Sequence, residues 1–451
     1  YARTLRSASE AAEAARWVSQ LEPLGGTNIY LALSEALQQA DSERPTVVIF
    51  LTDGLPTEGI IEEQSLLDAL QQEAPSSVRI FPFGVGYDVN TLLLDQLAED
   101  HRGRPSYVEP GERIDEVVSA FYAQVQSPLL TDIALDFKGV EVYDLYPQPL
   151  PDLYAGTQLI VTGRYEGEGP VEIELSGMVE GSLKTFVYGG EFVSDPDNDF
   201  IPRLWAARKI GYLLTQIRLH GENQEWIDAV VTLSLRYGII TPYTSFLIEE
   251  QDEALTSEGR EEAAEKFMAM PTPAAYGEEA VQDAESRLGL GGAQAMPPAM
   301  ELPAVGGGGD FNRPTTVIKY AGDKTFLCKD AACTDTLFVP DQMDTVDVRF
   351  DSDSYWQLLT SHPEWASYLA LSPEVIFVAA DGTAYHVHAD PGTVEDVLPE
   401  LPATVTPGPE APEVATSAAA PHAPSGGRDL CSGAMFLALI SLALALSFLR
   451  P

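Results

Sequence analysis

The first 126 residues alternate the patterns of buried strands and amphipathic helices. Two runs of β-branched and aromatic residues, at 46–51 and 78–84, are typical of parallel strands that are covered on both faces. Apolar residues recur at helical spacing in the stretches around them, over residues 8–21, 28–40, 62–73, 91–99 and 114–125. Strands that alternate with helices across short loops predict an α/β domain over residues 1–126, built on a doubly wound sheet.

After residue 127 the pattern becomes that of antiparallel strands. Five segments alternate apolar and polar residues between Gly/Pro turns, at 131–137, 141–146, 158–165, 171–176 and 183–188. Two helical patterns follow, over residues 202–220 and 224–237, and Gly238 ends the second. We therefore expect a β-rich region with two helices over residues 127–250.

Composition divides the rest of the chain. Residues 251–310 are acidic, then rich in Ala, Met and Pro, and they close with four glycines at 306–309, which is typical of a disordered linker. Within this linker a transient helix is expected near residues 258–268. Strand and helix patterns return over residues 311–390 and predict a small α+β module. A Pro/Ala-rich tether is expected over residues 391–429.

The last segment is continuously apolar from Ala434 to Leu449. With its flanks it reaches the length that crosses a hydrocarbon core, about 20 residues, so we expect a transmembrane helix over residues 430–451. A buried core helix is the alternative, which the missing polar face disfavours. Arg450 on the short tail predicts that the bulk of the chain is extracytoplasmic, as in a single-pass protein of the cell membrane.

Charge and cysteine content narrow the classes of function. The chain has 26 Lys+Arg against 69 Asp+Glu, a formal net charge of −43. This charge repels phosphate backbones, so nucleic-acid binding is excluded, and it favours the capture of cations. Three cysteines exclude a four-thiolate zinc site. Cys328 and Cys333 are close enough in sequence to form a disulfide outside the cytoplasm, and two unpaired thiols are the alternative.

Two short motifs at the ends of predicted elements suggest a metal site. Thr27 follows Gly25 and Gly26 and directly precedes a predicted helix, whereas Asp53 and Gly54 directly follow the first predicted strand. Loops at the carboxyl ends of parallel strands meet in a common crevice. One hydroxyl and one carboxylate suit a hard divalent cation, Mg²⁺ or else Ca²⁺ or Mn²⁺. The alternative is that Thr27 caps its helix and Asp53 opens a turn.

These motifs resemble part of a known family. The segments GGTNIYLAL, VVIFLTDGLPT and FPFGVGYDVN are similar to the later portion of a von Willebrand factor type A domain. A wider resemblance, to inter-alpha-trypsin-inhibitor heavy-chain-like proteins (the VIT/VWA family), continues through residues 202–210 and 233–246. The resemblance implies a Rossmann-like domain with a metal-ion-dependent adhesion site (MIDAS). In that site Thr27 would match the threonine and Asp53 the later aspartate.

The chain departs from the family at its beginning. It opens at Tyr1 within a helical pattern, so we expect an amino-terminally truncated sequence. The family's Asp-x-Ser-x-Ser motif and first strand would precede residue 1, as would its VIT domain. The segment 351–354, Asp-Ser-Asp-Ser, has the wrong order to replace that motif. We therefore expect Thr27 and Asp53 to hold an ion weakly, and with no Asp-Pro-His-Phe segment a hyaluronan-linked role does not carry over.

The predicted function is adhesion or protein interaction without catalysis. A partner protein with an exposed Asp or Glu would complete the coordination of the cation, while the carboxy-terminal helix anchors the chain to the membrane. One alternative is a structural protein of surface assemblies with a degenerate metal site. Another is an enzyme with an unrecognised site in residues 311–390, where no nucleophile–base arrangement is apparent.

A second metal-binding candidate is weaker. His386 and His388 alternate on a predicted strand, so both imidazoles face one side. No Cys and no third His lies nearby in the sequence, and we therefore expect an exposed strand face there rather than a metal site.

Overall fold

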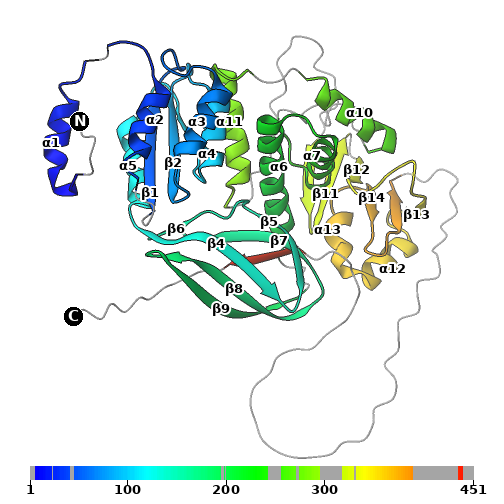
Figure 1. Ribbon diagram of the computed structural model, residues 1–451. Helices are drawn as coiled ribbons and strands as arrows, with labels where there is room; N and C mark the ends of the chain where they lie inside the picture. Colours follow the sequence, from blue (N-terminus) through cyan, green and yellow to red (C-terminus); the bar gives the residue numbers. More distant parts are fainter. Residues whose placement is uncertain are drawn as a thin grey trace, which may run out of the picture.

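The computed structural model describes residues 6–22, 24–40, 45–193, 198, 200–241, 255–270, 274–294, 317–329, 332–389 and 435–439. These residues form a parallel sheet with helices on both faces, a β-sandwich and a mixed α+β module (Figure 1). Helix α6 (Phe200–His220) packs on the sandwich, and α7 (Gln224–Tyr237) packs on α6 and reaches the module.

The parallel sheet has the doubly wound arrangement that the sequence predicts. Three strands pair in chain order: β1 (Thr46–Thr52), β2 (Val78–Val85) and β3 (Ser106–Val108). Side chains alternate across β2, so Val78 and Ile80 pack on one face and Phe81 and Phe83 on the other. The first face is covered by α2 (Ile29–Leu37), α3 (Glu63–Glu73) and α4 (Thr91–Asp100), and the second by α5 (Ile114–Val125). The expected α/β fold is confirmed.

Helix α1 stands apart from this sheet. It spans Ala11–Val18, follows the short 3-10 turn η1 (Ala8–Glu10), and contains no buried residue. Figure 1 shows it to one side of α2 and β1. The amphipathic pattern at 8–21 therefore predicts the helix correctly, but the apolar side of this helix is not buried against the sheet.

Two antiparallel sheets form the β-sandwich. Their orders are β6-β4-β8-β9 and β16-β7-β5. The strands are β4 (Pro128–Lys138), β5 (Glu141–Tyr146), β6 (Leu153–Tyr154), β7 (Ile160–Glu166), β8 (Gly169–Val179), β9 (Ser182–Phe192) and β16 (Met435–Leu439). Side chains from both sheets fill the space between them. Tyr165 of β7 stacks on Phe192 of β9 with 4.7 Å between ring centroids, and Val161 of β7 packs with Leu175 of β8.

Strand β16 contradicts the predicted membrane anchor. Its five residues lie within the apolar segment 434–449, and they pair antiparallel with β7, with Leu437 opposite Thr162. Within the described ranges, no helix is both long enough and apolar enough to cross a membrane. The prediction of a single-pass membrane protein is therefore wrong. An apolar run without periodicity does not distinguish a helix from a strand, and here the backbone groups are paired in a sheet. The predicted tether at 391–429 lies outside the described residues.

The predicted linker over 251–310 contains two helices. They are α10 (Ser257–Met268) and α11 (Glu278–Gly291). Figure 1 shows α11 between the parallel sheet and α6, where it packs on α4 and β3 as well as on α6. Its Arg287 is 1% exposed and pairs with Asp95 of α4 at 3.0 Å and with Asp283 at 2.9 Å. Helix α10 lies where a transient helix is expected. The expectation of a disordered linker is wrong for α11, because tertiary burial outweighs its acidic composition.

The carboxy-terminal module is a six-stranded mixed sheet covered by helices. Its strand order is β10-β11-β12-β14-β15-β13. Its elements are β10 (Val317–Ala321), β11 (Lys324–Lys329), β12 (Ala332–Asp335), β13 (Thr345–Arg349), α12 (Asp353–Ser361), η3 (Pro363–Trp365), α13 (Ala366–Leu369), β14 (Glu374–Val378) and β15 (Ala384–His388). Phe326, Leu358, Phe377 and Val387 are fully buried in its core. A disulfide joins Cys328 of β11 to Cys333 of β12.

Helices α6 and α11 cross at a point where only glycine fits. A Cβ atom added to Gly211 of α6 would lie 2.3 Å from the amide nitrogen of Gly291 in α11 and 2.8 Å from the carbonyl oxygen of Arg287. Both obstacles are backbone atoms, which cannot rotate away as a side chain can. This contact therefore sets how closely α11 approaches the rest of the fold.

Replacing Gly211 by alanine is expected to destabilise the protein by about 1–3 kcal/mol, because the two helices must separate. Urea unfolding of the intact chain measures this effect. Gly289→Ala in α11 is the matched control, since its Cβ meets nothing within 4 Å. That change is expected to stabilise the helix by about 0.5–1 kcal/mol. Equal midpoints for the two variants would contradict the close crossing.

Candidate functional site

Two loops meet at the carboxyl end of β1, and each carries one of the predicted metal ligands. Asp53 and Gly54 directly follow the last residue of β1, and Thr27 lies just before Asn28, the residue that caps α2. A Cβ built on Gly54 would lie 3.9 Å from the Thr27 hydroxyl oxygen. The structure therefore brings the loop of Asp53 against Thr27.

Backbone hydrogen bonds fix the position of Thr27. Its amide donates to the Thr57 hydroxyl at 2.7 Å, and its carbonyl accepts from the amides of Thr57 at 2.8 Å and Glu58 at 3.1 Å. The neighbouring Gly26 amide donates to a carboxylate oxygen of Glu58 at 3.1 Å. The Thr27 main chain is thereby anchored to the segment that follows the Asp53 loop, while its side chain is not part of this network.

Neighbouring residues perform the alternative roles of Thr27 and Asp53, which are to cap α2 and to make the local turn. Asn28 caps α2, because its side-chain oxygen accepts from the Leu31 amide at 2.9 Å. Thr52 makes the local turn, since its hydroxyl donates to the Gly54 carbonyl at 3.0 Å. Among the described residues, none hydrogen-bonds to the Thr27 hydroxyl or to the Asp53 carboxylate. Both oxygens are free to take a ligand.

The donor chemistry fits a hard divalent cation. Asp53 is exposed and Thr27 is half-buried, so an ion reaches both from solvent. A carboxylate and a neutral hydroxyl are oxygen ligands of the kind that Mg²⁺ and Ca²⁺ take, with water at the remaining positions. These residues leave most of the coordination sphere to water or to a partner.

Sequence comparisons identify the domain that carries these loops. Residues 3–107 match the family model described as von Willebrand factor type A domain. The chain carries a von Willebrand factor type A domain. The resemblance to this family is thereby confirmed, because the three sequence motifs that indicate it lie within the matched range.

The wider resemblance is confirmed as well. The chain is similar to inter-alpha-trypsin inhibitor heavy chain H2 of Sus scrofa, at 25% identity over 269 residues, which is 54% of this chain and 28% of the relative. It is also similar to heavy chain H4 of Homo sapiens, at 27% identity over 281 residues, 57% of this chain and 30% of the relative. The chain therefore spans less than a third of the length of the curated relatives it matches.

Solved structures resemble the fold more loosely. The von Willebrand factor type A from Catenulispora acidiphila matches with a TM-score of 0.36 and 14% identity, covering 64% of this chain and 75% of that one. The ArnB paralog VWA2 from Sulfolobus acidocaldarius matches with a TM-score of 0.30 and 15% identity, covering 60% and 70%. At these scores neither likeness adds to the assignment of the site, and the roles of Thr27 and Asp53 as ligands stay predictions.

Sequence reasoning missed the residues that position the site. Asn28 had a visible signal, because asparagine is as good a helix cap as threonine and stands next to the helix. Thr57 had none, because its hydroxyl meets the Thr27 amide through the tertiary arrangement of two loops.

The Gly26–Thr57 contact predicts a local effect in the von Willebrand type A domain. In Gly26→Ala the new Cβ would lie 2.6 Å from the Thr57 hydroxyl and displace it. The Thr27 amide then loses its acceptor, worth about 1 kcal/mol, and is expected to exchange its hydrogen about fivefold faster. Gly54→Ala is the control, since its Cβ makes only an ordinary contact. Equal protection of Thr27 in both variants would contradict the proposed anchoring.

Proposed function

We propose that the chain binds a protein partner through a divalent cation held by Thr27 and Asp53. The observation that carries this proposal is the Thr27 hydroxyl, which no other described residue hydrogen-bonds and which faces the loop of Asp53 at the carboxyl end of β1. The match of residues 3–107 to the von Willebrand factor type A family supports it, because the metal site that this resemblance implies has its threonine at Thr27 and its later aspartate at Asp53. Inter-alpha-trypsin inhibitor heavy chains are among the relatives.

The cation provides what the chain alone lacks. A net charge of −43 repels an acidic partner, whereas a bound Mg²⁺ supplies a local positive charge at the edge of the sheet. A neutral hydroxyl and few carboxylates leave the ion electron-poor and leave coordination positions to water. An exposed Asp or Glu of the partner would supply a further charged oxygen ligand in place of one of these waters.

This interaction is binding without catalysis. No bond of the partner is broken, so affinity depends on one charge-assisted bond and on the protein surface around it. Because Thr27 and Asp53 are the ligands the chain contributes, we expect weak binding of the free ion, with a dissociation constant of about 1 mM.

Paramagnetic Mn²⁺ tests where the ion binds. In the intact chain, Mn²⁺ is expected to broaden the amide signals of Thr27 and Gly54 before those of other residues. Asp53→Asn is expected to abolish this broadening, because the amide cannot neutralise the ion. Asp88→Asn is the matched control, since Asp88 is exposed and follows the neighbouring strand β2. Broadening that survives Asp53→Asn would contradict the site.

The dependence of partner binding on the ion is a separate test. A partner captured by the immobilised chain in Mg²⁺ is expected to elute in EDTA, and Asp53→Asn is expected not to capture it. Circular dichroism checks that the variant is folded. Capture that persists in EDTA would favour the alternative in which the domain organises an assembly and its metal site is degenerate.

A further inference from the structure

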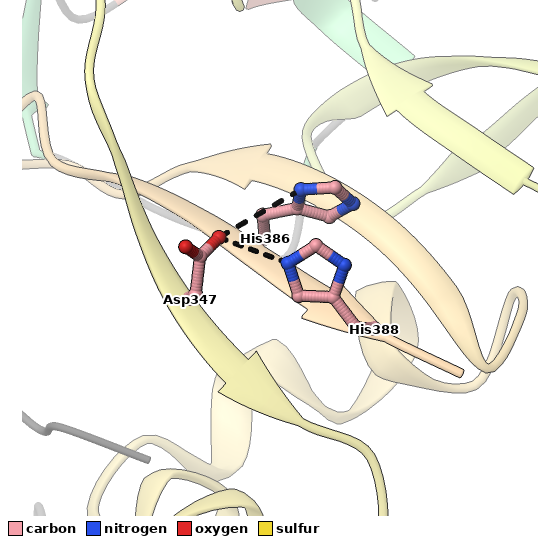
Figure 2. Close-up of side chains that lie close together, drawn as sticks. All are labelled: Asp347, His386 and His388. Atoms are coloured by element: carbon pink, nitrogen blue, oxygen red, sulfur yellow. Dashed lines mark hydrogen bonds and ion pairs between the residues drawn. The ribbon is translucent and has the colours of Figure 1, made fainter. Parts of the chain in front are cut away.

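The carboxy-terminal module gathers two imidazoles and a carboxylate on one face of its sheet. Asp347 in β13 is the Cα partner of His386 in the parallel strand β15, and His388 lies two residues further along. Side chains two apart on a strand face the same side. Figure 2 shows both rings directed towards Asp347 from the neighbouring strand. One Asp347 oxygen, Oδ1, lies 2.9 Å from Nε2 of His388 and 3.9 Å from Nδ1 of His386.

We infer that Asp347, His386 and His388 form a binding site for a divalent transition-metal ion of the Zn²⁺ class, with water as the fourth ligand. One donor atom from each residue lies within 4.8 Å of the other two. Zinc binds such atoms at about 2.0–2.2 Å in a tetrahedron, which places neighbouring donors about 3.3 Å apart. The distances from Asp347 Oδ1 to the two histidine nitrogens, 2.9 Å and 3.9 Å, lie on either side of that value. Small rotations of the side chains would therefore bring the three donor atoms to the separations that the ion requires.

The ligand types select the ion. Imidazole suits Zn²⁺ and its neighbours in the first transition row, whereas Mg²⁺ and Ca²⁺ require oxygen ligands. The side chains of His386 and His388 are 21% and 22% exposed, so solvent reaches them although the surrounding sheet limits their motion. This site is therefore chemically distinct from Thr27 and Asp53, and it does not rest on the function proposed for them.

A further carboxylate orients one ring. Glu374 of β14 places Oε1 3.8 Å from Nε2 of His386, the ring nitrogen that faces away from Asp347. A carboxylate there favours the tautomer with its proton on Nε2 and leaves the Nδ1 lone pair for the ion.

An ordinary Asp–His pair explains only part of this geometry. The 2.9 Å contact with His388 satisfies Asp347 by itself. His386 nevertheless directs a nitrogen at the same carboxylate oxygen, with only 3.6 Å between the two ring centroids. A cation among the three groups satisfies all of them. It would also add a side-chain link between β13, an edge strand of the sheet, and β15, with which β13 already pairs.

Calorimetric titration of the intact chain with Zn²⁺ tests the inference. Excess Mg²⁺ is present throughout, so that sites made of carboxylates alone are occupied. We expect a single tight Zn²⁺ site, with affinity reduced more than about 100-fold in His388→Ala and in Asp347→Asn. Glu374→Gln is expected to reduce it about tenfold, because Glu374 only positions His386.

Two controls keep the test specific. His362→Gln changes an imidazole of the same module that pairs with Glu364 at 3.0 Å, and it is expected to leave the affinity unchanged. In the unchanged chain, imidazole ¹⁵N spectra are expected to show Zn²⁺-induced shifts of Nδ1 of His386 and Nε2 of His388, but not of His362. Equal shifts of all histidines, or an affinity that His388→Ala and Asp347→Asn leave intact, would overturn the site. Asp53→Asn is expected to leave Zn²⁺ binding unchanged, so this result and the Mn²⁺ result are independent.

Discussion

The anchoring of Thr27 to the segment after the Asp53 loop is the contact on which the proposed metal site depends. Its amide donates to the Thr57 hydroxyl and its carbonyl accepts from the amides of Thr57 and Glu58, and this fixes the main chain without using the Thr27 hydroxyl. Asn28 takes over the cap of α2 and Thr52 the local turn. Each neighbour thus performs the structural task that would otherwise occupy the two candidate ligands. An arrangement in which no other described residue bonds to this hydroxyl and carboxylate at a sheet edge is suited to binding.

The elements with strong periodicity were predictable from the sequence. The pattern placed β5 and α5 at the bounds that the structure shows, because alternation or helical spacing holds across each whole element. Strand β3 was missed, since three residues are too few to show a period. Thr27 and Asp53 were identifiable because both directly adjoin regular elements. Their proposed role as ligands is supported by the family resemblance and by the meeting of their two loops at the carboxyl end of β1, and not by periodicity in the sequence.

The sequence predictions are wrong where tertiary contacts determine the structure of a segment. Helix α11 has an acidic sequence typical of a linker, but Arg287 is buried against Asp95, which lies far away in the sequence. The apolar segment near residue 437 satisfied the length rule for a membrane helix, yet it pairs as a strand with β7. Nothing in the sequence marks Asp347 as a ligand beside His386 and His388, because only the parallel register of β13 and β15 places it there. None of these pairings has a local signal.

Adhesion through this domain requires that a cation bind between Thr27 and Asp53. Crystals of the chain grown in Mn²⁺ show whether it does, because the anomalous signal of manganese distinguishes this ion from the light atoms of protein and water. We expect an anomalous peak in contact with the Thr27 hydroxyl and the Asp53 carboxylate at the carboxyl end of β1. An Asp53 side chain turned away from Thr27, with manganese bound only elsewhere on the acidic surface, would contradict it.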